Sequence, residues 1–162
     1  MKNSFFLLTL SALILVSCST SSEDQILGVW NAEESYISIS EEIPLTGAIL
    51  NVEKVGHDFD AITEFKEDGT FNSSGMYTET TTSTINGAAS SIDSEVDFSN
   101  YNGTYEILED DKIRFTVSGQ TNIYNIVELS NTKLTYELFD TITNINPVES
   151  TSIRYVRQSF SK

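Results

Sequence analysis

The chain carries a single thiol, Cys18, and the residues before it make this the side chain best placed for chemistry. A charged start, Met1-Lys2, is followed by an apolar run over residues 5–16, and the small Ser17 directly precedes the cysteine. A basic start, an apolar stretch shorter than the about 20 residues of a membrane span, and a small-residue junction are typical of a secretory signal. Cleavage before Cys18 leaves its thiol beside a new amino terminus, where it can accept a lipid.

The four residues Leu15-Val16-Ser17-Cys18 resemble the lipobox of bacterial lipoproteins at every position. The resemblance implies that Cys18 carries a thioether-linked diacylglycerol and an acylated amine. Each buried methylene of these chains contributes about 0.8 kcal/mol to membrane attachment. Ser19, rather than an aspartate, follows the cysteine, which by analogy with enterobacterial sorting favours anchoring in the outer membrane of the cell envelope.

Length and composition limit the organisation of the chain and its partners. The formal net charge of −15 repels phosphate backbones, so we exclude nucleic acid as a partner. With its only cysteine used by lipid, a monomer forms no disulfide, and stability must come from core packing. We expect residues 1–17 to be the removed signal, residues 18–24 the lipidated cysteine with a flexible tether, and residues 25–162 one folded domain.

His57 is the only histidine, and Asp58 and Asp60 lie close to it in the sequence. A transition-metal site needs several convergent nitrogen or sulfur ligands, so we expect an exposed loop histidine and no metal or other cofactor. Neither a second cysteine nor a Gly-x-Ser-x-Gly nucleophile elbow accompanies it, so we expect no enzymatic activity. A hydrolase or isomerase that uses His57 is the weaker alternative.

Asp93, Glu95 and Asp97 alternate along the chain. In a strand these carboxylates share one face, and in a loop they could bind Ca²⁺ through oxygen. The glycine-containing spacing of calcium loops is absent, so we expect a solvent-exposed acidic face.

Strands must position all of these residues. Thr, Ile, Val, Tyr and Phe dominate the segments between polar turns, which is a strand-forming composition. The clearest hairpin joins residues 103–108 to residues 112–117, where Ile113, Phe115 and Val117 alternate with polar residues.

Further segments extend the antiparallel series to about eight strands. The remaining strands are expected over residues 26–30 with the run into 39, then 61–66, 70–77, 121–129, 133–138 and 151–157. Asp68-Gly69 predicts a hairpin turn, because glycine accepts a positive φ. Two stretches break the spacing: residues 40–60 are expected to hold a short helix or a strand with its loops, and residues 78–99 a Thr/Ser-rich insertion with little core.

Short motifs occur in a fixed order: Gly28-Val29-Trp30, then Phe-Lys-Glu-Asp-Gly-Thr-Phe over residues 65–71, then Gly103-Thr104-Tyr105, and Leu134 near the end. Together with the lipobox, this series resembles the lipocalin-like lipoproteins of Bacteroidota. The resemblance covers most of the chain after the signal. It implies an all-β, up-and-down antiparallel β-barrel of about eight strands.

The resemblance also implies how one end of the barrel is closed. Trp30, next to Gly28, plugs that end, and an arginine of the last strand lies across the indole ring, a cation–π contact of about 0.5–2 kcal/mol. The candidates are Arg157 and Arg154, which point to opposite faces of a strand, so only one of them can contact Trp30. We favour Arg157.

An eight-stranded barrel is about wide enough for one small ligand or for its own side chains. Seven aromatic residues fall on the strands expected to wall it and are candidates to line a cavity: Phe65, Phe71, Tyr77, Tyr105, Phe115, Tyr124 and Tyr136. Aromatic residues dominate ordinary β cores, which favours a packed interior over a cavity.

Two functions remain open. The resemblance implies a lipid-anchored envelope protein whose barrel binds a small apolar or amphipathic ligand. The alternative is a non-enzymatic structural or interaction protein with a packed barrel, whose loops bind another envelope protein or a glycan.

Overall fold

The computed structural model describes residues 21–99, 101–109, 111–144 and 150–162. Its elements are a short helix and nine strands: α1 (Ser22–Ile26), β1 (Gly28–Ile43), β2 (Ala48–Phe65), β3 (Thr70–Ile85), β4 (Ala88–Asp97), β5 (Asn102–Leu108), β6 (Lys112–Val117), β7 (Gln120–Leu129), β8 (Lys133–Asn144) and β9 (Ser150–Ser161). The predicted signal and Cys18 lie outside the described residues.

Eight of the nine strands close one antiparallel barrel. The sheet order is β2-β1-β9-β8-β7-β6-β5-β3-β4, and β2 also pairs with β3, which completes the circle. β4 lies outside this circle, against β3. The predicted all-β barrel of about eight antiparallel strands is confirmed.

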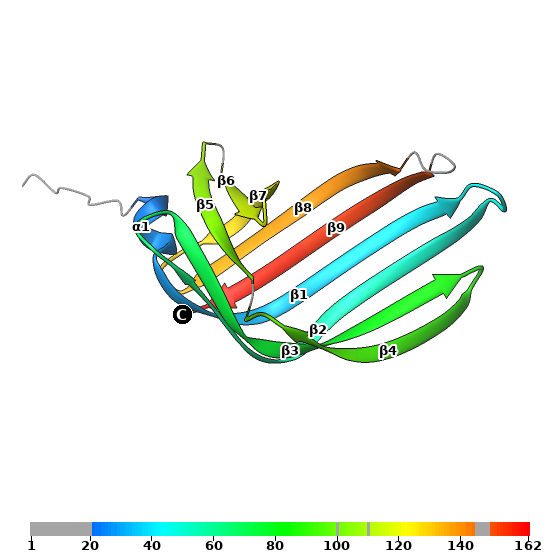
Figure 1. The fold of residues 1–162 in the computed structure, drawn as a ribbon, viewed down its shortest axis with the longest axis horizontal. Helices are drawn as coiled ribbons and strands as arrows, with labels where there is room; N and C mark the ends of the chain where they lie inside the picture. The colour runs from blue at the N-terminus through cyan, green and yellow to red at the C-terminus, as the bar shows by residue number, and fades with distance from the viewer. Residues whose placement is uncertain (1–20, 100, 110, 145–149) are drawn as a thin grey trace, which may run out of the picture.

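The barrel is complete along only part of its length. Residues 70–72 of β3 pair with β5, whereas residues 76–85 of the same strand pair with β4. The short strands β5, β6 and β7 therefore complete the circle at one end, which we call the closed half. Beyond it, β8, β9, β1, β2, β3 and β4 continue as a six-stranded antiparallel sheet, which we call the open half (Figure 1).

Irregularities in three neighbouring strands mark the boundary between the halves. The pairing of β1 with β2 shifts register between Asn31 and Tyr36, and the pairing of β2 with β3 shifts between His57 and Asp60. Such bulges bend a strand and increase its twist. Gly75 lies opposite the second shift with φ +89°, and a Cβ there would lie 1.9 Å from the Asp60 carbonyl oxygen. Only glycine allows β3 to approach β2 this closely.

The two stretches left irregular by the sequence are regular strands. Residues 40–60 form the end of β1 and most of β2, so the alternative of a short helix there is wrong. Residues 78–99 form the rest of β3 and all of β4, joined at Asn86-Gly87, where both residues have positive φ as a two-residue hairpin requires. Most of β4 is exposed, which fits the prediction that this segment offers little core.

α1 begins inside the segment predicted to be a flexible tether. Ser21 is its N-cap, and the Asp24 amide donates to the Ser21 hydroxyl at 3.1 Å. Ile26, the last residue of the helix, is fully buried in the closed half. The folded domain therefore starts several residues before the predicted boundary at residue 25.

Candidate functional site

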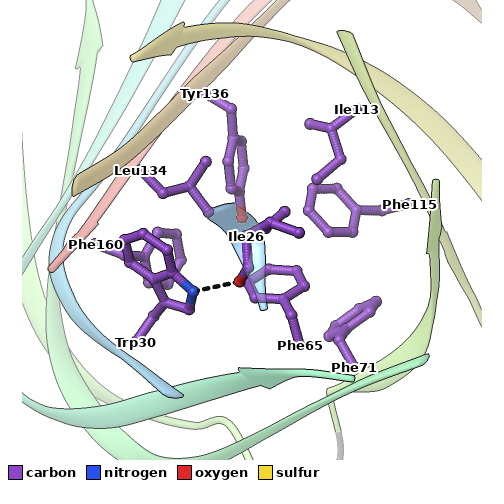
Figure 2. Close-up of a cluster of buried hydrophobic side chains, with 9 residues drawn as sticks. All are labelled: Ile26, Trp30, Phe65, Phe71, Ile113, Phe115, Leu134, Tyr136 and Phe160. Atoms are coloured by element: carbon purple, nitrogen blue, oxygen red, sulfur yellow. Dashed lines mark hydrogen bonds between the residues drawn. The ribbon is translucent and has the colours of Figure 1, made fainter. Parts of the chain in front are cut away.

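Nine apolar side chains fill the closed half, and we call them the aromatic floor (Figure 2). They are Ile26, Trp30, Phe65, Phe71, Ile113, Phe115, Leu134, Tyr136 and Phe160, each exposed by 5% or less. Neighbouring rings meet at ordinary packing distances, such as 5.3 Å between the centroids of Phe71 and Phe115 and 5.7 Å between Tyr136 and Phe160. This end of the barrel is packed by its own side chains.

Trp30 joins three segments at the closed end. Its indole Nε1 donates to the Ile26 carbonyl oxygen of α1 at 2.6 Å, so the one polar group of the buried ring is satisfied (Figure 2). The Lys162 Nζ lies 4.4 Å from the ring centroid and donates to the Gln25 carbonyl oxygen at 2.9 Å. Partial desolvation lowers the pKa of the Lys162 ammonium. The end of the chain therefore supplies the cation over Trp30.

The prediction that Arg157 or Arg154 lies on Trp30 is wrong. Arg154 donates two hydrogen bonds, of 3.0 and 2.7 Å, to the Asp140 carboxylate. Arg157 Nε lies 3.4 Å from Glu34 Oε2. The register explains the difference, since β9 continues to Ser161, which lies opposite the residue that follows Trp30. Both arginines are too far back along the strand, and only Lys162 reaches the ring.

Gly28 sits where α1 gives way to β1. Its φ of +108° is a conformation that L side chains rarely adopt, and it lets the chain turn from the helix into the strand. The glycine of the Gly-x-Trp motif thus has a backbone role.

The seven aromatic candidates for a cavity wall take two kinds of place. Four of them, Phe65, Phe71, Phe115 and Tyr136, belong to the aromatic floor. Tyr105 packs edge-on against Phe65 at 5.0 Å, and its hydroxyl donates to the Lys66 carbonyl oxygen at 2.9 Å. These five residues pack the closed half and line no cavity wall above the floor.

A chain of rings leads from the floor toward the open half. Tyr77 stacks on Phe59 at 5.1 Å and meets Phe98 at 5.4 Å, and Tyr101 links Phe98 back to Phe71. Sequence reasoning missed Phe98 and Tyr101. Phe98 lies at the end of the segment interpreted as an insertion with little core, residues 78–99, and Tyr101 follows that segment. The turn after β4 carries both rings back toward the barrel.

Polar groups lie directly above the floor. The Tyr136 hydroxyl donates to Gln158 Oε1 at 2.5 Å. Tyr124 meets the rings of Phe115 and Tyr136, and burial raises the pKa of its phenol to about 12, with the nearby Arg154 acting in the opposite direction. Both phenols therefore stay neutral at neutral pH, and the Tyr136 hydroxyl has a hydrogen-bond partner.

The inner face of the open half is aliphatic around two ion pairs. Cross-strand pairing and alternation bring together Ile37, Ile39, Val52, Lys54, Glu79, Leu138, Asp140, Arg154 and Val156. Lys54 Nζ lies 2.9 Å from Glu79 Oε1, and the Glu79 side chain is only 8% exposed. The Asp140–Arg154 pair flanks Ile39 on the neighbouring strand. We take this inner face as the candidate binding surface.

His57 lies on the outer face, in strand β2 and not in the loop predicted for it. Its Nδ1 is 2.8 Å from Asp58 Oδ2, its Nε2 is 3.1 Å from Thr80 Oγ1, and the Thr80 hydroxyl donates to Asp93 Oδ1 at 2.7 Å. These contacts tie β2, β3 and β4 together on the outer face of the sheet.

Asp93, Glu95 and Asp97 share the outer face of β4, as their alternation predicts, opposite Thr80, Thr78 and Met76. Hydrogen bonds from Ser99 lower the pKa of Asp97. Across the described ranges, no three His, Cys, Asp or Glu side chains are grouped so as to hold a metal ion.

A groove of about 410 Å³ lies on the outside of the closed half, beside α1. Its lining combines Leu27, Gly69, Tyr105 and Ile107 with the acidic residues Glu23, Asp24, Glu67 and Glu106. These carboxylates repel anionic molecules, and a purely apolar molecule would leave them without partners. The groove is therefore a weaker candidate for a binding site than the aliphatic inner face.

Comparison of the chain with protein-family models, with curated proteins and with solved structures gives no match. Within the part of the chain that the structure describes, no helix is long and apolar enough to cross a membrane. The structure shows the barrel, and the membrane anchor stays a prediction from the lipobox.

Proposed function

We propose that the chain is a lipid-anchored, non-enzymatic protein of the bacterial cell envelope, held in the outer membrane through Cys18, which binds a small amphipathic ligand. The lipobox and the signal before it support the anchor. The resemblance to lipocalin-like lipoproteins supports ligand binding.

The observation that carries the proposal is the inner face of the open half. Lys54–Glu79 and Asp140–Arg154 are set among the half-buried side chains of Ile37, Ile39 and Leu138. Ligand sites commonly combine apolar walls with a few fixed polar groups that orient the ligand. The aliphatic residues suit a hydrocarbon chain, and the two cations, each held by a carboxylate, suit a polar head.

The first test uses a dansyl-labelled fatty acid as the probe and the Cys18→Ala variant, so that no lipid anchor competes for it. Ile39→Gln on the inner face should weaken probe binding about tenfold. The substitution replaces apolar surface with a polar amide and so removes about 1.4 kcal/mol of binding free energy. The matched control is Ile153→Gln, because Ile153 lies on the outer face of the adjacent strand and is 47% exposed. Equal effects of the two substitutions, or no saturable binding, would contradict a site on the inner face.

The second test concerns the anchor. Cys18→Ala should move the protein from the membrane fraction to the soluble envelope fraction and abolish labelling by a radioactive fatty acid in growing cells. Several buried acyl chains hold a protein on a bilayer, and without them the acidic chain has no comparable attraction to lipid. Unchanged membrane partitioning, with no acyl label in either form, would refute lipidation.

A second candidate function is docking of an envelope protein or glycan. It is favoured by Phe139 and Ile153, which are 67% and 47% exposed on the outer face and flank Tyr155. Native mass spectrometry of the purified protein separates the two functions. A co-purifying small molecule that is lost on denaturation supports the binder, and a bare mass directs the search to a macromolecular partner.

A further inference from the structure

We infer that the protein stands on the membrane by its closed half, with the inner face of the open half directed away from the bilayer into the aqueous phase. This inference rests on the proposed lipidation of Cys18 and goes beyond it, because it fixes which surface of the barrel faces lipid.

The short tether keeps the acylated residue close to the start of α1. Ser21 is the N-cap of α1, three positions after Cys18. Three extended residues span at most about 10–11 Å. Cys18 therefore stays within about 11 Å of Ser21, at the start of α1.

The start of α1 is in turn fixed to the closed half. Ile26 is fully buried in the aromatic floor, and its carbonyl oxygen accepts the hydrogen bond from Trp30 (Figure 2). The Lys162 ammonium binds the Gln25 carbonyl oxygen on the same helix. Swinging α1 toward the open half would break both contacts and expose a core side chain.

The length of the strands separates the far end of the open half from the anchor. β1 alone has 16 residues, and a strand rises about 3.3 Å per residue, which gives about 50 Å along the strand and about 40 Å along a barrel axis tilted by about 40°. The far end of the open half, at the turn over residues 44–47, therefore lies several tether lengths from the anchor. α1 and the C-terminus occupy the opposite end (Figure 1).

The distribution of charge favours an upright pose over one lying on the barrel wall. The chain has a formal net charge of −15, so a pose that lays more of its surface on anionic lipid brings more carboxylates against it. The lysines of the closed end do not reverse this, since Lys66 pairs with Glu64, Lys133 pairs with Glu128, and Lys162 donates to the Gln25 carbonyl oxygen. The acyl chains therefore hold the closed half on the bilayer. The wall formed by β4 exposes Asp93, Glu95 and Asp97.

The orientation has a consequence for the ligand class. An amphipathic ligand that reaches the inner face arrives through water, since Ile39 lies eleven residues along β1 from Gly28, about 28 Å along the barrel axis. The molecule is therefore one with an appreciable aqueous concentration, such as a short-chain amphiphile, and not a lipid drawn sideways from the leaflet beneath the protein.

The test measures the distance of each end from the bilayer by energy transfer. Asn131→Cys lies in the exposed turn between β7 and β8 at the closed end, and Leu45→Cys lies in the turn at the open end, where Leu45 is 85% exposed. Because Cys18 is acylated, each introduced thiol is the only free one and can carry a fluorescent donor. The acylated full chain is placed in vesicles of phosphatidylethanolamine and phosphatidylglycerol that hold a headgroup-linked acceptor.

Transfer from position 131 should be at least threefold more efficient than transfer from position 45. Equal transfer from the two positions, or a reversed order, would overturn the orientation while leaving the anchor intact. Failure of the acylated chain to stay with the vesicles, as expected only for the Cys18→Ala control, would overturn the anchor and the orientation together. Circular dichroism of each labelled variant checks that the barrel is retained.

Discussion

Among single residues, Trp30 is the one on which the closed half depends. Its ring fills the floor, its N–H holds α1, and its outer face carries Lys162 from the end of the chain. Segments from both termini of the described chain therefore meet at one side chain, which explains why a Gly-x-Trp pair stands at the start of the first strand.

Trp30→Ala should lower the free energy of unfolding by about 3–5 kcal/mol, because it empties a fully buried site and frees α1. Trp30 is the only tryptophan, so urea unfolding should be followed by circular dichroism. Val29→Ala is the matched control, since Val29 is the neighbouring residue and is 48% exposed. A loss below about 1 kcal/mol for Trp30→Ala would contradict a role as a plug.

The resemblance implied a buried Trp30 covered by an arginine of the last strand. Trp30 is buried and a cation covers it, but that cation is Lys162. The identity of the cation depends on how far β9 runs, and the strand was predicted to end at residue 157 whereas it continues to Ser161. Because β9 is four residues longer than predicted, the residue that reaches the Trp30 ring is Lys162 and not Arg157.

Among the elements, β3 has the most demanding position, because it pairs with β2 along one side and with both β5 and β4 along the other. Gly75 lies between the residues that pair with β5 and those that pair with β4. Its carbonyl oxygen accepts from the Phe98 amide, which brings the turn after β4 back to the barrel.

Gly75→Ala should destabilise the protein by about 3 kcal/mol or more, because the added methyl group meets the Asp60 carbonyl oxygen and the φ of +89° is strained for alanine. Gly47→Ala is the control. Gly47 also has a positive φ, of +64°, but open space surrounds it, so the loss should be about 1–2 kcal/mol. Equal urea midpoints for the two variants would contradict this prediction, because they would mean that β2 and β3 move apart at Gly75 without loss of stability.

Local signals predicted some elements well and others not at all. The hairpin of β5 and β6 was predicted to within one residue, since both its turn and its alternation are local. β4 was missed because Ile92 and Val96 are its only large apolar residues and most of the strand is exposed, so alternation leaves little hydrophobic trace. The Asn86-Gly87 turn was the signal that could have revealed it.

For the molecule as a whole, buried phenols link stability to alkaline pH. Burial raises the pKa of Tyr124 to about 12 and holds the pKa of Tyr136 well above its usual value of 10. Between pH 10 and 12 the folded state keeps protons that the unfolded chain releases. This contribution is therefore complete below pH 10 and is lost as the pH rises through about 12.

The free energy of unfolding should fall by about 1–2 kcal/mol per phenol between pH 9 and 11.5, as measured by urea midpoints. Tyr124→Phe removes one titrating group without emptying the site, so its decline should be shallower. Tyr36→Phe, a change on the outer face, serves as the control and should follow the wild-type curve. Parallel curves for all three proteins would contradict the burial of Tyr124.

The candidate site was the least predictable feature. Aromatic residues on wall strands were expected from composition, and a packed interior was the favoured outcome. The pairs Lys54–Glu79 and Asp140–Arg154 join strands through cross-strand register, which a single sequence does not specify. The inner face therefore emerged only once the strands were aligned.

β3 and β5 are joined by a short ladder. It consists of three residue pairs, Thr70 with Thr104, Phe71 with Gly103 and Asn72 with Asn102, whereas β1 and β2 pair along most of their length. With so few pairs, the β3–β5 boundary is the weakest part of the barrel wall. Local unfolding starts where the fewest hydrogen bonds must break, so amide hydrogens along this boundary should exchange first. Parting it would turn the cylinder into a curved sheet and give solvent a lateral route to the floor, without disturbing the helix at its base.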